Sequence, residues 1–265
     1  MRNIVDFIIK NINSFVFIIL LSISFSQVIS RNYYQASKFN LFSSSIINII
    51  KERINNLHRY TELNKENNKL INENLSLRNN LILSKKTKGF LKTNFKYSHG
   101  KIIDNSIRYT KNFVTIDLGK RDGISINDGI VSSKGIIGII NRVSENFSSG
   151  ISILNSKLKI NAVLKKSDHF GSLFWNGKDH QIMSLEDIPK SARISIGDTI
   201  SSGGMSSIFP RDILIGVISS FNLPESSNYY KISVKLFEDF GSLRNIYVVK
   251  NELKDEFNEL KNRNE

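Results

Sequence analysis

Cysteine is absent from this chain of 265 residues. Its absence excludes a disulfide framework, a thiol nucleophile and a zinc site with cysteine ligands. The compartment is left open, because a protein in an oxidising compartment need not contain a disulfide. Proline occurs only three times, which argues against a proline-rich linker. With 40% hydrophobic residues, the chain is long enough for one or two small domains with cores of their own.

Histidine is also scarce, with only His58, His99, His169 and His180. No two of them have the H-x-x-x-H or H-E-x-x-H spacing that places two ligands on one helix face. The sequence therefore predicts no metal site, and no motif points to a cofactor.

A serine nucleophile is suggested at one place only, in the segment 197–204. Gly-Asp followed by Ser-Ser-Gly-Gly resembles the Gly-Asp-Ser-Gly-Gly turn of trypsin-like proteases, but inserted residues break the spacing. The same segment lacks the Lys-Ser/Thr ending of a phosphate-binding loop. Asp122, Asp128 and Asp198 stand beside glycine, where Asp commonly bonds its own turn backbone. We expect structural turns and no catalysis.

The balance of charge is strongly basic, with 37 Lys and Arg against 24 Asp and Glu, a formal net charge of +13. Three interpretations are open: a solvated basic surface, attraction to an anionic membrane or envelope polymer, and attraction to nucleic acid. The apolar N-terminal segment favours the membrane over nucleic acid, and we expect no nucleic-acid partner.

Residues 12–29 carry no charge, and at about 1.5 Å per residue a helix of this length just crosses a hydrocarbon core roughly 30 Å thick. A signal peptide cleaved before Gln27 is the rival interpretation. Because helix-forming sequence follows soon afterwards, we expect an uncleaved transmembrane anchor over 12–30 and a short cytoplasmic tail over 1–11. The chain would then be a single-pass inner-membrane protein with its bulk in the periplasm.

A long helix is expected over 43–88, where glycine and proline are missing up to Lys86. Leucine recurs there every seven residues, and asparagine falls at the alternate heptad position. Leu at d with Asn at a favours a weak parallel two-stranded coiled coil. A single amphipathic helix lying on its own domain is the alternative. The residues expected at the dimer interface are Leu63, Leu70, Leu77, Asn67 and Asn74.

Beyond Phe95 the apolar pattern changes to a period of two, with turn residues about every eight to twelve positions, which predicts a sandwich or small barrels. We expect two β subdomains, 95–170 and 171–250, whose strands could interleave, and a charged tail over 251–265 that frays as a helix or stays disordered. The expected strands are Val114–Leu118, Ile130–Val131, Ile136–Ile140, Ser152–Leu154, Ile160–Leu164, Gly171–Trp175, Lys231–Phe237 and Ile246–Val249, with a further strand pair inside Ile196–Ile218. Asn176-Gly177 predicts a type I′ hairpin turn.

Two segments of this region echo one another, 123–140 and 194–218. Each contains a strand, an acidic turn, a second strand, a glycine turn and an apolar strand with an internal glycine. The echo predicts two related β units. The residues expected to shape the turns of the head are Gly123, Gly135, Gly138, Gly197, Asp198, Gly203, Pro210 and Gly216.

An ordered set of short motifs carries a family resemblance. It consists of Asp117–Gly123, Gly129–Val131, Lys134–Val143, Gly171–Gly177, Leu185–Pro189, Ile196–Gly203, Ile208–Arg211, Ile215–Ile218 and Ile246–Val249. Together with the order of anchor, coil and β head, these motifs resemble the MreC family of bacterial rod-shape-determining proteins. The resemblance implies a head of two small β-barrel-like subdomains and self-association as dimers or larger assemblies. It also implies four partners: a class B penicillin-binding transpeptidase, RodA, MreD and, through MreD, MreB.

We therefore expect a mainly β head preceded by an N-terminal transmembrane helix and a long coiled-coil helix. The expected function is a non-catalytic, membrane-anchored scaffold that maintains cell shape by organising peptidoglycan synthases. Two alternatives are an envelope hydrolase of the β-barrel protease type and a periplasmic adaptor subunit. The adaptor would need a helical hairpin, of which the sequence shows a single arm.

Overall fold

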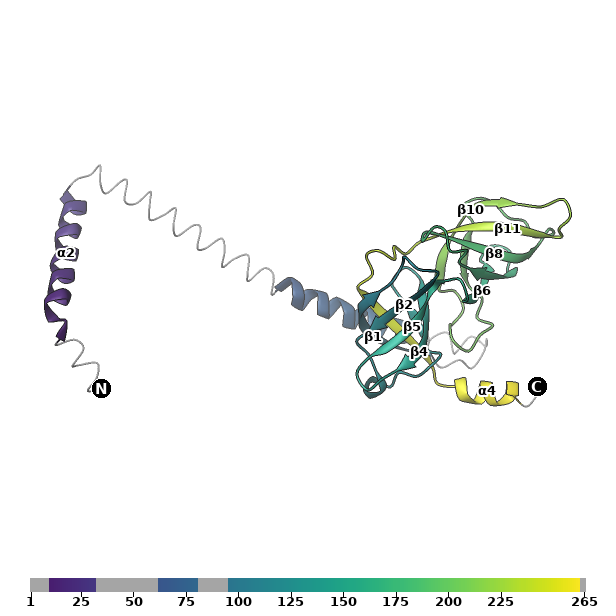
Figure 1. Ribbon diagram of the computed structural model, residues 1–265, viewed down its shortest axis with the longest axis horizontal. Coiled ribbons are helices and arrows are strands. Elements are labelled where there is room, and N and C mark those ends of the chain that lie inside the picture. The colour runs from purple at the N-terminus through teal and green to yellow at the C-terminus, as the bar shows by residue number, and fades with distance from the viewer. Residues whose placement is uncertain (1–9, 32–61, 81–94, 263–265) are drawn as a thin grey trace. The chain divides into compact units, whose positions relative to one another are not determined.

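A computed structural model describes residues 10–31, 62–80 and 95–262 (Figure 1). The chain divides into two compact units, Met1–Lys69 and Leu70–Glu265, and the second unit contains the β head. The expected tail over 1–11 and the coil over 43–88 lie partly outside the described residues.

The N-terminal unit contains helix α2, Ile12–Arg31. Its serines do not interrupt it, since Ser22 Oγ donates a hydrogen bond of 2.8 Å to Ile18 O inside the helix. Its large apolar side chains are exposed, for example Phe17 and Leu20. In the described part of the chain, no helix combines the length and the apolar character needed to cross a membrane. The anchor over 12–30 stays a prediction.

The first barrel closes in the strand order β1-β12-β3-β4-β5-β2, with every neighbouring pair antiparallel. A short 3-10 turn, η2 (Lys120–Asp122), leads toward β3. Closure leaves no free strand edge in the wall. The strands are β1 (Phe95–Asn105), β2 (Lys111–Ile116), β3 (Gly129–Val131), β4 (Ile136–Val143), β5 (Ser148–Asn155) and β12 (Asn245–Asn251).

The second barrel closes in the order β10-β11-β8-β7-β6-β9, again with antiparallel neighbours. Helix α4 (Lys254–Asn262) follows the last strand of the first barrel. The strands of the second barrel are β6 (Lys159–Leu164), β7 (Phe170–Phe174), β8 (Ile182–Pro189), β9 (Thr199–Ser202), β10 (Leu214–Asn222) and β11 (Tyr229–Leu236).

The division between the barrels differs from the expected boundary at 170/171. It falls between β5 and β6, because β6 pairs with β7 and β9 of the second barrel. Strand β12 returns to the first barrel, where it lies between β1 and β3. Spacing along the sequence could not show this, because the pairing partners are far apart in the chain.

The two barrels are permuted copies of one topology. When β3, β4 and β5 are matched to β9, β10 and β11, the remaining strands β2, β1 and β12 fall on β8, β7 and β6. The sixth position is filled by β12, the last strand of the chain, in the first barrel. In the second barrel it is filled by β6, the strand with which that barrel begins. The echo of 123–140 and 194–218 is therefore a structural repeat.

The hydrogen bonds of the two acidic turns repeat as well. Asp128 Oδ2 accepts a bond of 2.8 Å from Ser125 N, and Asp198 Oδ2 accepts one of 2.7 Å from Ser195 N. The backbone bonds run back in the same direction, from Asp128 N to Ser125 O at 3.2 Å and from Asp198 N to Ser195 O at 3.1 Å. Both aspartates thus serve their own turns, as the neighbouring glycines indicated.

Each acidic turn is joined to the apolar strand that follows it by a residue with positive φ. Asn127 has φ 65° and donates to Ile140 O at 2.8 Å, while Gly197 has φ 88° and donates to Ile218 O at 2.9 Å. Glycine reaches this conformation without a steric penalty, and asparagine is among the residues that tolerate it. Gly123, at φ 77° after η2, forms a third left-handed turn.

Gly138 and Gly216 lie inside strands β4 and β10, as the echo of the two segments predicts, and not in the turns with which they were also grouped. A Cβ at Gly138 would collide with Ile151 O of β5, and a Cβ at Gly216 would collide with Lys235 O of β11. Glycine is needed there because the backbone of the adjacent strand passes too close for a side chain.

The apolar core lies inside the barrels, with inward residues alternating along the strands. Trp175 belongs to it, 4% exposed, and its Nε1 donates to Asp179 O at 2.7 Å. The expected type I′ turn at Asn176-Gly177 was wrong, because a longer loop, residues 175–181, joins β7 to β8 and only Gly177 of the pair has positive φ. Among the largest fully buried side chains are Ile116, Ile130, Ile140, Leu164, Leu173, Met183 and Leu185.

Candidate interaction surfaces

The serines of the Ser-Ser-Gly-Gly segment are buried in β9. Ser201 is 0% and Ser202 is 1% exposed. Ser202 Oγ donates to Pro210 O at 2.6 Å and accepts from Ile213 N at 2.9 Å, so its hydroxyl closes the 203–212 loop. Neither hydroxyl is placed to attack a substrate. The hydrolase alternative therefore loses the nucleophile on which it depended.

The head histidines lie apart from these serines. His169 Nδ1 is 3.0 Å from Ser167 Oγ in a turn, and His99 packs edge to face on Tyr247 with ring centroids 5.7 Å apart. In the portions of the chain that the structure describes, no group of three or more His, Asp or Glu side chains is arranged to hold a metal ion.

Two of the expected turn residues, Gly203 and Gly135, lie at close approaches of the backbone, the first inside the second barrel and the second between the barrels. Gly203 N donates to Asn161 O at 3.1 Å, and a Cβ at Gly203 would collide with the Asn161 side chain. Gly135 lies in the β3–β4 turn, closed by the Ser132 N to Gly135 O bond of 2.7 Å. A Cβ at Gly135 would come within 2.9 Å of Leu214 O at the start of β10. Glycine lets the two barrels approach backbone to backbone there.

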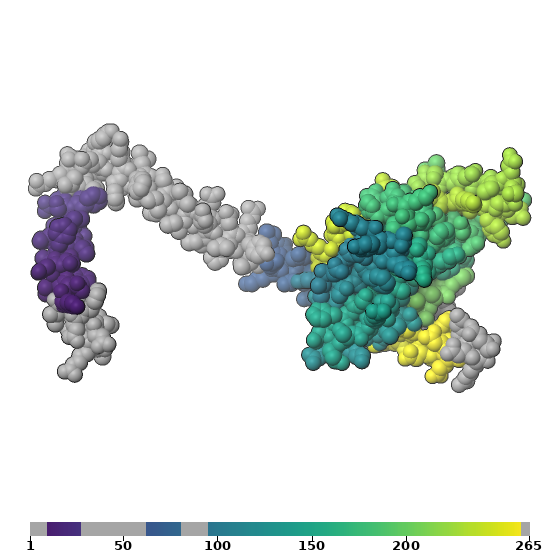
Figure 2. Space-filling model, in the orientation of Figure 1, coloured from purple at the N-terminus to yellow at the C-terminus, as the bar shows by residue number. Residues whose placement is uncertain are grey.

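A second close approach lies beside it, where the Phe209 ring fills the space in which a Cβ at Gly129 would lie. Phe209 is only 3% exposed although it belongs to a loop. On the face of the head drawn in Figure 2, the teal first barrel and the green second barrel lie against one another. The barrels therefore share an apolar contact.

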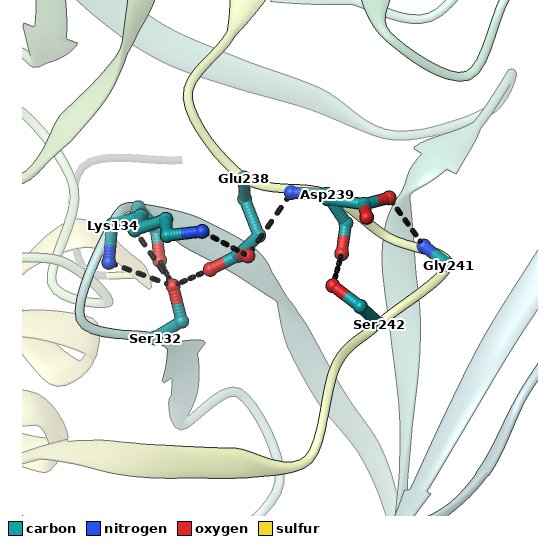
Figure 3. Close-up of polar contacts among 7 residues, drawn as sticks. Ser132, Lys134, Glu238, Asp239, Gly241 and Ser242 are labelled. Atoms are coloured by element: carbon teal, nitrogen blue, oxygen red, sulfur yellow. Dashed lines mark hydrogen bonds and ion pairs between the residues drawn. The ribbon is translucent and has the colours of Figure 1, made fainter.

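The polar part of this junction centres on Glu238, in the segment that leads from β11 back to β12 (Figure 3). One of its carboxylate oxygens accepts a short hydrogen bond from Ser132 Oγ in the first barrel. The other lies 3.9 Å from Lys134 Nζ. Ser132 Oγ also accepts bonds of 3.0 Å from Lys134 N and from Gly135 N. Glu238, 9% exposed, therefore has partners on both of its oxygens.

The return segment is ordered by its own side chains, as Figure 3 also shows. Asp239 N donates to Glu238 Oε1 at 3.0 Å, and Asp239 Oδ1 accepts from Gly241 N at 2.9 Å. The Gly241 N–H is the largest cause that lowers the pKa of Asp239. Phe240, fully buried, accepts at its carbonyl a bond of 2.6 Å from Asn105 Nδ2. We conclude that the junction, residues 129, 132–135, 209, 214 and 238–242, fixes the barrels to one another.

One face of the helix over residues 62–80 packs on the first barrel. Leu75 packs against the core, and Asn79 Oδ1 accepts from Tyr97 N at 3.0 Å. The Arg78 guanidinium lies 4.7 Å from the ring centre of Tyr247 and 5.7 Å from that of Tyr97. Burial raises the pKa of Tyr97, and the charge of Arg78 opposes this shift. The sequence did not indicate that Arg78 attaches the helix to the first barrel, because its aromatic partners, Tyr97 and Tyr247, are distant in the chain.

The leucines expected at the dimer interface are exposed in a single copy. Leu63 is 57%, Leu70 51% and Leu77 59% exposed. Asn67 is also exposed, and the exposed Asn74 donates from Nδ2 to Leu70 O at 3.0 Å within the helix. The seven-residue spacing places the leucines on one stripe. Nothing in the single chain tests the dimer, which stays a prediction.

The C-terminal tail forms helix α4, whose first residue is buried against the first barrel. Lys254 Nζ donates a short bond to Ile126 O and lies 3.2 Å from Asp128 Oδ1. Burial raises the pKa of Asp128, and the Ser125 N–H and the Lys254 charge oppose that shift only in part. The sequence predicts a tail that frays as a helix or stays disordered, so this anchor is a difference that the structure shows.

Comparison with known proteins agrees with this architecture. The family described as "Rod shape-determining protein MreC, barrel core" matches residues 102–250, which include most of the strands of both barrels. The cell shape-determining protein MreC of Streptococcus pneumoniae is 25% identical over 148 residues, 53% of this chain and 53% of that protein. The chain thus matches about half the length of this relative.

Solved structures show the same fold. MreC of Listeria monocytogenes superposes with a TM-score of 0.57 at 20% identity, over 75% of this chain and 93% of that chain. MreC of Helicobacter pylori, solved in a complex with a penicillin-binding protein (PBP2), superposes with a TM-score of 0.50 at 20% identity, over 60% of this chain and 99% of that chain. With the family match extending over more than half of its residues, this chain belongs to the MreC family of rod shape-determining proteins.

Proposed function

We propose that this chain is a non-catalytic, membrane-anchored scaffold that maintains cell shape by organising peptidoglycan synthases. The observation that carries the proposal is the head: two closed barrels, fixed to one another by the Glu238 junction, in a family whose Helicobacter pylori member is solved with PBP2. A rigid head presents its surfaces in a constant relation, which preserves binding geometry for more than one partner.

The chemistry of the head supports binding rather than catalysis. Ser201 and Ser202 are buried, and Ser202 uses its hydroxyl to close its own loop. The glycines of the family motifs lie in left-handed turns or at close approaches of neighbouring residues, which are structural roles. The adaptor alternative gains no support, because no second helical arm lies in the described residues.

Anchor and coil complete the proposal. Helix α2 has 20 residues, about 30 Å at 1.5 Å per residue, and exposes large apolar side chains from Ile12 to Phe25. We place it in the inner membrane, with the N-terminus cytoplasmic and the head periplasmic. A parallel dimer through Leu63, Leu70 and Leu77 would carry two heads. It would therefore bind a clustered partner more tightly through avidity, without new contacts.

The proposed partners are a class B penicillin-binding transpeptidase, RodA, MreD with MreB behind it, and a second copy of the chain. The transpeptidase is supported by the Helicobacter pylori complex. RodA and MreD follow from the family alone.

Complementation in the chain's own host tests the proposal. Depletion should convert rods to round cells, and the unchanged chain should restore rods. Ser201→Ala should restore them equally well, because Ser201 Oγ has no hydrogen-bond partner in the structure and its removal costs little. A Ser201→Ala protein that is present at normal level but fails to restore rods would argue for serine chemistry.

A further inference from the structure

Two loops beside the first barrel carry cations, the β1–β2 turn (106–110) and the β5–β6 link (156–158), which leads into strand β6 of the second barrel. Arg108 and Lys111 come from the turn and the strand after it, and Lys157 and Lys159 come from the link and the strand after it. All four are exposed. We call these residues, with Tyr109 and Phe113, the basic tip.

Backbone bonds hold the two loops together. Ser156 donates to Thr110 O from both its N, at 3.1 Å, and its Oγ, at 3.2 Å. In the sheet, Lys111 of β2 is the register partner of Asn155 of β5. The cations of the two loops are therefore neighbours on one surface although about fifty residues separate them in sequence.

A buried asparagine stiffens the tip. Asn112 is 0% exposed, and its Nδ2 donates to Tyr109 O and to Leu154 O, both at 2.7 Å. Its Oδ1 accepts from Tyr109 N at 3.0 Å. The turn is thus clamped through the backbone of Tyr109, whose ring is left 69% exposed. Phe113, 40% exposed, lies on the same outward face of β2 as Lys111, two residues away.

The charge of the tip is not neutralised locally. Neither 105–111 nor 155–159 contains an acidic residue, and Asp104 is the nearest acid before the turn. Elsewhere on the head, exposed cations have acidic partners, such as Arg211 with Asp168 and Lys166 with Asp198. Among the ion pairs of the described residues, none involves the four tip cations; Lys159 instead lies 5.3 Å from the ring centre of Phe174.

We propose that the basic tip docks on an anionic phospholipid surface. Exposed Tyr and Phe beside Lys and Arg are suited to the membrane–water interface, where rings settle at headgroup level and cations meet lipid phosphates. A soluble polyanion would use the cations but would gain less from the two exposed rings. Each cation raises the partition coefficient of the head onto an anionic leaflet about fivefold. Four cations bind an untethered head only weakly, but a tether to the same membrane raises the effective concentration of the head and makes this binding effective. The tether is the anchor of the proposed function, on which this inference rests.

A single label tests the docking in the full chain. Because the chain has no cysteine, Thr110→Cys gives one attachment site for the fluorophore nitrobenzoxadiazole while Tyr109 is kept. The chain is incorporated into vesicles of phosphatidylcholine, with or without phosphatidylglycerol. We expect the emission to rise about twofold with phosphatidylglycerol only and to fall back at high salt. The same label at Ser226→Cys, in the exposed β10–β11 turn, should not respond.

A charge-matched pair of variants separates the tip from the net charge. Replacing the four tip cations by Gln should abolish the response at position 110. Replacing Lys178, Lys190, Lys231 and Lys235 on the second barrel, all exposed, by Gln should preserve it. An equal response in neutral vesicles, a response that survives the tip variant, or an equal response to soluble polyphosphate would overturn the proposal. Vesicle flotation reports the anchor separately, so a chain that floats with a silent label refutes the tip alone.

Discussion

Glu238 makes the polar contact between the two barrels with a single side chain. Its carboxylate accepts from Ser132 Oγ and faces Lys134 across the junction. Glu238→Ala leaves Ser132 without that acceptor, and we expect a loss of about 1–3 kcal/mol in the free energy of unfolding, measured by urea denaturation. Glu225→Ala, in the exposed β10–β11 turn, should change it by less than about 0.5 kcal/mol. Equal losses in the two variants would show that the junction adds no stability.

Asp128 gives the head a pH dependence whose sign follows from its raised pKa. In the unfolded chain its carboxyl titrates near its ordinary value, so the folded head binds the proton more tightly. The contribution of Asp128 therefore falls as the pH rises from its unfolded pKa through its folded pKa. We expect the stability of the unchanged protein, minus that of Asp128→Asn, to decrease from about pH 4 to pH 7 in urea titrations. A difference that increases with pH would contradict the burial of this carboxylate.

The sequence could predict the residues whose role is local, and it could not predict the residues whose partners are distant in the chain. Gly123 and Gly197 were foreseen as turns, because a left-handed backbone leaves a local signal. Glu238 and Lys254 were not, because each meets a partner more than a hundred residues away. The turn of Asp128 was predicted correctly, but nothing in the neighbouring sequence indicated its ion pair with Lys254 of the C-terminal helix.

The helix over 62–80 has two faces with different roles, and this is where the dimer is tested. Leu75 and Arg78 contact the barrel, whereas Leu70 lies on the exposed leucine stripe. Leu70→Asp places a charge at a d position, and we expect it to shift the full chain from dimer to monomer in light scattering, with the head still folded. Ser76→Asp adds the same charge to an exposed position off that stripe and should leave the mass unchanged. A Leu70→Asp protein that keeps the dimer mass would exclude this coil as the interface.

Most strands could be predicted because each barrel wall has a buried face and an exposed face, which leaves an alternating pattern. The strand β11, with buried Ile232, Val234 and Leu236, is an example. Strands β1 and β8 were missed. Both depart from the alternation: three consecutive residues of β1, Tyr97 to His99, are half-buried, and β8 contains Asp187 with φ 68° and ends at Pro189. An irregular strand loses the alternation on which the prediction depends.

At the scale of the whole molecule, the head is one barrel topology used twice with a different starting strand. The sequence echo predicted two related units, but only the strand order shows that β12 takes the place in the first barrel that β6 takes in the second. Because of this return of the chain, the second barrel is inserted between β5 and β12 of the first. The chain therefore crosses between the barrels twice, at residues 156–158 and at residues 237–244, and the second crossing carries Glu238 of the junction.

We propose that this head binds a cell-wall synthase without catalysing a reaction. The most direct measurement is the binding of the purified full chain to the periplasmic part of the class B penicillin-binding transpeptidase of the same cell, by biolayer interferometry. We predict saturable binding in the micromolar range or tighter, and no binding to a carboxypeptidase from the same envelope as a control. Failure of the transpeptidase to bind, with both proteins folded, would contradict the scaffold.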